Sequence, residues 1–261
     1  MQRIPTSLYC VALALAILPA ASGQHAEDGL LLYLTGEPVE NLAEPASAPV
    51  DLGKFAVDAA EAVVGSGCLR YDPGRQGRPF IEVDLPTARI TGLEAVSVSL
   101  WAKSGRAAGF LFSCGYPDDD FRWMFASNRR ERFLALTIGG EQHRYPLPEA
   151  FDPSPWRHYA LVLNLGGDRR ARIYIDGELF VTTHSFGDGD FYEGEDSHLV
   201  GTVGYYAFEE DTLPLSRPFR IGGINTAGNA WQGHIDDFRL FSRPLSPAEI
   251  AELAQPNQPQ R

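Results

Sequence analysis

Glu82 and Asp84 begin a pattern of carboxylates that could cleave glycosidic bonds. A retaining glycosidase needs a nucleophile and an acid about 5 Å apart. A strand supplies them through a Glu-x-Asp-x-x-Glu spacing, because alternate side chains then enter one cleft. Here Leu85-Pro86-Thr87 follows instead, so the third carboxylate is missing and Pro86 ends the strand. The spacing argues against retaining glycosidase activity.

Other catalytic arrangements are also missing from the sequence. There is no Gly-x-Ser-x-Gly nucleophile elbow. The six His residues are scattered, without a metal-binding pair at helical spacing. His158 has no acid nearby in sequence, so we interpret it as a packed strand residue rather than a base. We therefore predict that the chain is not an enzyme.

Aromatic and acidic residues suggest recognition instead. Tyr116, Asp118 and Asp120 precede Trp123 in a stretch typical of a ligand-binding rim loop, and we predict these four as ligand-binding residues. The alternative is a solvated acidic loop. Trp101 is a second aromatic candidate, which is either exposed on a sheet face or buried under a second sheet.

A long acidic stretch stands out near the middle of the chain. Ser185–Leu213 contains eight acids, several aromatic residues and neither Lys nor Arg. Ordering it requires a cation, a basic partner or neighbouring Arg residues. Asp188 and Asp190 alternate with Gly and are predicted calcium ligands, since Ca²⁺ takes carboxylate and carbonyl oxygens, although the full calcium-loop spacing is lacking.

The N-terminus predicts export. Residues 1–23 have a single positive charge, an apolar run over Leu8–Leu18 and small residues before the expected cleavage point, as in a signal peptide. The alternative is an uncleaved membrane anchor. No later segment is apolar for long enough to span a membrane. We expect a secreted, periplasmic or cell-envelope protein.

Charge and cysteines fit that compartment. The formal net charge is −12, which makes the chain a poor binder of nucleic acid and suits divalent cations, neutral sugars or basic partners. Outside the leader, Cys68 and Cys114 form an even pair in an oxidising environment. They are either bridged by a disulfide or buried as free thiols.

The elements that must position these residues are strands. Val96–Lys103 alternates apolar and polar residues, and further short β-rich segments follow it, separated by Gly, Asn and Asp. Asp176-Gly177 lies between two apolar runs, which is a strong hairpin signal. One helix is predicted after Ser246, where Pro follows the N-cap and Glu249 completes a capping box.

The order of these segments resembles the laminin-G-like, concanavalin A-like domains. Six stretches carry the resemblance from about Gly29 to Leu253: Gly67–Asp72 with Phe80–Val83, Val96–Lys103, Trp156–Val162, Arg172–Glu178, Phe219–Gly223, and Trp231–Phe241 with Arg243–Ser246. The resemblance implies an all-β, two-sheet antiparallel jelly-roll sandwich whose chain ends pair near each other. It also implies that the first two segments form an opening strand pair.

The resemblance also bears on metal and function. Asp236 stands where related sandwiches often use an acid for structural Ca²⁺; the alternatives are that it caps backbone N–H groups or pairs with Arg239. We expect a signal peptide at 1–23, one sandwich domain at 24–254 and a flexible tail at 255–261.

We predict a secreted, non-catalytic module that binds carbohydrate or a cell-surface glycoprotein. One alternative is a structural adhesion module that binds a protein through residues 185–213. The other is a glycan-active hydrolase with unrecognised catalytic residues.

Overall fold

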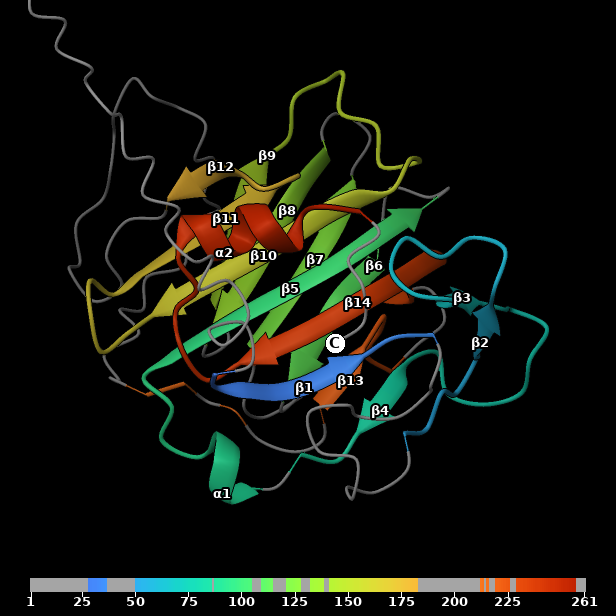
Figure 1. Cartoon of the computed structure of the whole chain (residues 1–261), viewed down its shortest axis with the longest axis horizontal. Helices are drawn as coiled ribbons and strands as arrows, with labels where there is room; N and C mark the ends of the chain where they lie inside the picture. The colour runs from blue at the N-terminus through green and yellow to red at the C-terminus, as the bar shows by residue number, and fades with distance from the viewer. Residues whose placement is uncertain are drawn as a thin grey trace, which may run out of the picture.

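The alternating segments form two antiparallel sheets packed face to face (Figure 1). The computed structural model describes residues 28–36, 50–85, 87–104, 109–114, 121–127, 132–138, 141–182, 212–213, 215, 219–225 and 229–256. The strands are β1 (Leu30–Leu34), β2 (Phe55–Asp58), β3 (Cys68–Tyr71), β4 (Ile81–Val83), β5 (Ala95–Ser104), β6 (Gly109–Cys114), β7 (Phe121–Ser127), β8 (Arg132–Ile138), β9 (Glu141–Pro146), β10 (Arg157–Asn164), β11 (Arg170–Ile175), β12 (Glu178–Thr182), β13 (Phe219–Ile221) and β14 (Gly233–Phe241). The helices are α1 (Thr87–Ile90) and α2 (Pro247–Leu253).

Each sheet draws strands from distant parts of the chain. Within the described residues, the larger sheet has eight strands in the order β12-β11-β10-β5-β14-β3-β2, with β1 also paired to β14. The smaller sheet has six, in the order β4-β13-β6-β7-β8-β9. The predicted all-β jelly-roll sandwich with a short C-terminal helix is confirmed.

Strand β5 shows how the sequence determines which face is buried. Val96, Val98 and Leu100 enter the core between the sheets, while the alternate residues, Trp101 among them, face outward. Trp101 is nevertheless only 7% exposed, because residues of the segment between β2 and β3 pack on it. Both sequence-based interpretations of Trp101 were therefore wrong: it is neither exposed nor under the second sheet.

The predicted hairpin and helix are both present. Asp176 and Gly177 have φ of 53° and 83° in the turn between β11 and β12, so both central residues are left-handed, as expected for Asp-Gly. Helix α2 begins after Ser246 with a complete capping box to Glu249. Its apolar residues pack on the outer face of the larger sheet. Helix α1 was not predicted.

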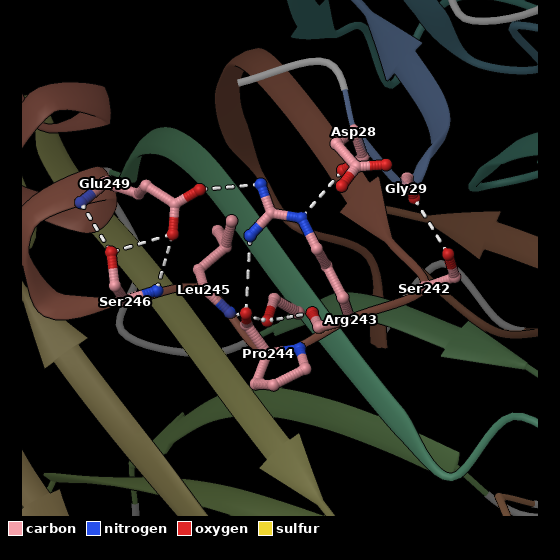
Figure 2. Close-up of polar contacts among 9 residues, drawn as sticks. Asp28, Gly29, Ser242, Arg243, Pro244, Leu245, Ser246 and Glu249 are labelled. Atoms are coloured by element: carbon pink, nitrogen blue, oxygen red, sulfur yellow. Dashed lines mark hydrogen bonds and ion pairs between the residues drawn. The ribbon is translucent and has the colours of Figure 1, made fainter. Parts of the chain in front are cut away.

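The beginning of the described chain is joined to its end, as the resemblance implied. Strand β1 pairs with β14. Figure 2 shows the polar contacts that secure this closure. Arg243 Nε donates to the carbonyl of Asp28 at 2.8 Å, and Ser242 Oγ donates to that of Gly29 at 3.1 Å. Arg243 also pairs with Glu249 at 2.6 Å, which connects the closure to α2.

The expected opening strand pair is not present. Strand β3, within Gly67–Asp72, pairs with β2 and β14 in the larger sheet, whereas β4, within Phe80–Val83, pairs with β13 in the smaller one. Leu69 and Ile81 enter the same core from opposite sides. The chain between β3 and β4 therefore crosses between the sheets rather than forming a hairpin.

Candidate functional site

The predicted ligand loop before β7 is not supported by the position of Trp123. This side chain is fully buried, with its ring 6.3 Å from that of Phe112 and 6.4 Å from that of Tyr159. Trp123 is two residues after the core residue Phe121 on an alternating strand, so it enters the same core. The prediction that Trp123 contacts a ligand is wrong. Tyr116, Asp118 and Asp120 lie outside the described residues.

Asp236 caps backbone N–H groups, which is one of the alternatives that the sequence left open. Its Oδ2 accepts hydrogen bonds from Val63 N and Val64 N, both at 2.9 Å, and its Oδ1 accepts one from Asp237 N at 2.8 Å. Burial raises the pKa of Asp236 to about 6, although the bonds from Val64 and Val63 oppose that rise. The carboxylate therefore fixes the segment between β2 and β3 against the sheet.

These contacts do not fit a calcium site at Asp236. Three N–H dipoles already point at the carboxylate, and they would repel a cation. Within the part of the chain that the structure describes, no group of three His, Cys, Asp or Glu side chains is placed to hold a metal ion. The other predicted calcium ligands, Asp188 and Asp190, lie outside the described residues, as does most of the acidic stretch.

Cys68 and Cys114 are buried free thiols, so the predicted disulfide is absent and the alternative holds. Cys114, on β6 of the smaller sheet, faces the core between the sheets. Cys68 alternates with the core residue Leu69 on β3 of the larger sheet and therefore faces away from that core. Burial raises the pKa of the Cys68 thiol to about 12.

A buried Ser–His pair lies on the outer face of the larger sheet. Ser99 Oγ and His158 Nε2 are 2.9 Å apart, a distance compatible with a nucleophile and its base. However, His158 Nδ1 has no hydrogen-bond partner, so no carboxylate orients the ring, and both residues are fully buried. Burial, and secondarily Arg239, lowers the pKa of His158 to about 3. His158 is thus a packed, neutral residue, as the sequence suggested.

Next to this pair, a bulge in β14 builds a second internal contact. Asp237, with φ of 48°, accepts a hydrogen bond from Arg239 Nη2 at 2.8 Å. The Arg239 guanidinium also lies 4.4 Å from the ring centre of Tyr33 on β1. Arg239 therefore pairs with Asp237 rather than with Asp236. The polar residues at the centre of this face bind one another.

Much of the outer face of the larger sheet is therefore covered by the chain itself. Helix α2 packs over one part of it, and the segment that Asp236 holds packs over another. In Figure 1, α2 lies on the viewer's side of the larger sheet, while β6, β7 and β8 of the smaller sheet lie behind it. The outer face of the smaller sheet differs, since its apolar pair Phe133 and Ala135 gains no further apolar partner from the described chain.

A row of polar residues crosses this outer face. Their neighbours along the strands are core residues, so these residues face outward. Register partners place them side by side on β4, β13, β6, β7 and β8. This polar row consists of Glu82, Arg220, Ser113, Arg122 and Thr137. At about 4.8 Å per strand, it spans about 19 Å.

Hydrogen bonds order one end of the polar row. Arg220 Nε donates to Glu82 at 3.2 Å, and Arg78 donates to the other oxygen of the same carboxylate. In the middle, Ser113 Oγ donates to the carbonyl of Gly223 at 3.3 Å. Ser113 and Thr137 are only 1% exposed, so the partly exposed groups of the row are the guanidinium groups of Arg220 and Arg122 and the carboxylate of Glu82. Both oxygens of Glu82 are engaged by arginines.

Three arginines of this face lie over phenylalanine rings. Arg220 is 4.6 Å from the ring centre of Phe80, Arg122 is 5.7 Å from that of Phe110, and Arg144 is 5.0 Å from that of Phe133. The arginines come from β13, β7 and β9. Phe110 and Phe133 lie on the neighbouring strands β6 and β8, and Phe80 directly precedes the neighbouring strand β4. We call these three pairs the Arg–Phe ladder.

Sequence analysis did not identify the polar row or the Arg–Phe ladder. The local signal was present, because Arg122 and Arg220 each lie between two core residues on a short strand. What joins them is the strand order, in which β13 inserts between β4 and β6.

Comparisons with known proteins support the fold. No family model matches the sequence, and no curated protein matches it. Membership of the laminin-G-like family therefore stays a prediction. Solved structures do match: the binding domain of botulinum neurotoxin DC in complex with rat synaptotagmin II has a TM-score of 0.61 at 14% identity, over 88% of this chain and 52% of that one.

Two further structures give the same result. The receptor binding domain of the botulinum neurotoxin C/D mosaic serotype has a TM-score of 0.60 at 16% identity, over 87% of this chain and 51% of that one. The binding domain of Paraclostridial Mosquitocidal Protein 1 has a TM-score of 0.59 at 13% identity, over 88% and 52%. The chain thus spans about half the length of these structures, and at this identity they share its fold.

Among the described helices, none is long and apolar enough to cross a membrane. The predicted leader, residues 1–23, lies outside the described residues.

Proposed function

We propose that the chain is a secreted, non-catalytic module that binds carbohydrate, free or on a cell-surface glycoprotein, across the outer face of the smaller sheet. The polar row carries this proposal. Ser113 and Thr137 are buried, so the row offers the partly exposed groups of Glu82, Arg220 and Arg122 over about 14 Å. Such a row matches a linear oligosaccharide, whose hydroxyl groups recur along its length.

Two further observations support a binding role. Much of the larger sheet's outer face is occupied by α2 and by the segment that Asp236 holds, so the proposal places the ligand on the other sheet. Two structures with this fold are binding domains of botulinum neurotoxins, one of them a receptor binding domain. By analogy of fold, we extend a binding role to this chain.

Catalysis is not part of the proposal. Glu82, the carboxylate that began the glycosidase pattern, is held by Arg78 and Arg220. The Ser99–His158 pair is buried and lacks an orienting acid. Export through the leader at residues 1–23 and a calcium requirement outside the described residues remain predictions that belong to this proposal.

The test is a glycan array probed with the chain lacking residues 1–23, with and without calcium. We expect binding to a defined set of glycans. The double variant Arg122→Gln/Arg220→Gln should weaken that binding at least tenfold, since hydrogen bonds to charged groups contribute about 1.5–3 kcal/mol each. Arg75→Gln, an exposed arginine in the turn after β3, is the control.

Two results would contradict the proposal. One is the absence of glycan binding by a protein whose circular dichroism shows the β-sandwich. The other is binding that the double variant and the Arg75→Gln control retain equally, because the ligand would then lie on another surface.

A further inference from the structure

A second row of side chains crosses the outer face of the larger sheet, at the end of β5 and the beginning of β14. Lys103 is the register partner of His234, which is in turn the partner of Arg70 on β3. Trp156 directly precedes β10 and lies beside Lys103. The strand neighbours of these residues are core residues, so the row faces outward: Ala102, Ile235 and Leu69. We call these four residues the Trp156 row.

Direct contacts join this row to the segment between β2 and β3. The Lys103 ammonium pairs with Glu61 of that segment and lies 5.2 Å from the ring centre of Trp156. The rings of Trp156 and His234 are 6.0 Å apart. Trp156 is partly exposed, and one side of it is therefore bordered by charged and polar groups.

The other end of the row is organised by Asp58. Its Oδ2 lies 3.3 Å from Arg70 Nε and 3.4 Å from His234 Nε2. Its Oδ1 accepts a hydrogen bond from Ala60 N at 3.0 Å, which orients the carboxylate. The segment that carries Glu61 is thus fixed by Asp58 on one side and by Asp236, through Val63 and Val64, on the other.

The two ends of this network are open to solvent. The side chains of Glu61 and Arg70 keep 49% and 44% exposure, whereas those of Lys103 and His234 keep 17% each. Glu61 meets Lys103 through Oε2, and Arg70 meets Asp58 through Nε. Among the described residues, Glu61 Oε1 and both Nη groups of Arg70 therefore have no hydrogen-bond partner. Lys103 and Arg70 are two strand spacings, or about 10 Å, apart.

The charges of the network favour a neutral ligand. Lys103 and Arg70 are balanced by Glu61 and Asp58, and burial, followed by the charge of Lys103, lowers the pKa of His234, which keeps it uncharged at neutral pH. A sugar hydroxyl can both donate and accept, so it suits an open carboxylate oxygen at one end and guanidinium N–H groups at the other.

We propose that the Trp156 row and Glu61 form a second binding site, which takes a neutral disaccharide. One ring donates a hydroxyl to Glu61 beside the apolar edge of Trp156, and the other accepts hydrogen bonds from the Nη groups of Arg70. Because the protein's own contacts already hold these groups in place, little ordering is required on binding. The site lies on the opposite sheet from the polar row, so it does not rest on the proposed function, and a chain with both sites would hold two glycans at once.

The test is calorimetry with four neutral disaccharides: cellobiose, maltose, lactose and diacetylchitobiose. We expect at least one to bind the chain lacking residues 1–23. Its affinity should change less than about twofold between low salt and 0.5 M salt, because no net charge is neutralised. Binding should also change the tryptophan fluorescence, and Trp156→Phe should remove that change while the other three tryptophans remain.

Variants at the two open ends locate the site. Arg70→Lys keeps the charge beside Asp58 but loses the guanidinium fork, and Glu61→Gln loses the carboxylate. Each should weaken disaccharide binding about tenfold and change the melting temperature little, because exposed ion pairs contribute little to stability. The matched controls, Arg75→Gln and Glu149→Gln, remove exposed charges elsewhere and should bind as wild type does.

Three results would overturn the proposal: no binding of any of the four disaccharides by the folded protein, binding that both site variants retain in full, or binding that 0.5 M salt abolishes. The double variant Arg122→Gln/Arg220→Gln separates this site from the proposed function. It should leave disaccharide binding unchanged while weakening the binding that the polar row supports, so either site can fail without the other.

Discussion

Replacing Glu249 with Gln removes one negative charge from the closure of the chain and little else. Glu249 accepts a hydrogen bond from Arg243 at 2.6 Å and another from the backbone of Ser246 at 2.8 Å (Figure 2). Gln can also occupy the third position of a capping box, so the start of α2 is preserved. The variant therefore isolates the charge that Arg243 meets.

The size of the effect follows from the pKa of Glu249. Burial alone would raise this pKa, but the hydrogen bonds from Arg243 and Ser246 lower it from 4.5 to about 2. At 1.36 kcal/mol per unit, the ceiling on its contribution to stability is about 3.4 kcal/mol. The side chains of Arg243 and Glu249 keep 24% and 21% exposure, so solvent screening reduces our expectation to about 1–2 kcal/mol.

The sign of the pH dependence is fixed by the lowered pKa. A carboxyl that ionises more readily when folded stabilises the fold above its unfolded pKa, and that contribution fades as pH falls from 4.5 toward 2. Urea unfolding of wild type and Glu249→Gln should therefore differ by about 1–2 kcal/mol at pH 7 and converge near pH 2. Glu149→Gln, an exposed glutamate, is the control. A difference independent of pH would refute the reasoning.

Four further results are expected from the same structure. Asp236→Ala should lower the free energy of unfolding by about 3 kcal/mol or more, because three backbone N–H groups lose their acceptor; a small loss by urea titration would contradict the cap. Trp123→Phe should destabilise the core by about 1–3 kcal/mol while glycan affinity stays unchanged, and a selective loss of affinity would restore Trp123 as a ligand residue. Cys68 and Cys114 should resist a thiol reagent in the native protein and both react after denaturation without reductant; two unreactive residues would indicate a bridge. Gly177→Ala should cost about 1 kcal/mol in thermal unfolding, because φ there is 83°, and an unchanged melting temperature would argue against the left-handed turn.

Local sequence patterns predicted most strands and their turns. Alternation within Val96–Lys103 is enough to assign two faces, and Asp176-Gly177 is enough to place a hairpin. Alternation does not say which face meets the second sheet or what covers the other. Trp101 faces away from the core yet is buried, whereas Trp123 faces into it. The surroundings of both tryptophans are therefore set by tertiary contacts, which the local alternation of residues does not contain.

The candidate site was harder to predict because its parts meet only across strands. Asp236 caps Val63 and Val64, which lie more than 170 positions away in sequence. Arg122 and Arg220 join one row only because β13 enters the smaller sheet beside β6. No window of neighbouring residues contains that information, since the register between distant strands depends on the whole topology.

The pairing of β1 with β14 affects the order in which the chain can fold during its synthesis. Leu32 leaves the ribosome early, yet its partner Leu240 is made more than two hundred residues later. Contacts between such distant residues form slowly, because a long loop must close first. Among the described strands, β1 pairs only with β14, so its residues have no partner in the larger sheet until that last strand has been made. The larger sheet can therefore complete its strand pairing only when synthesis of the chain is almost finished.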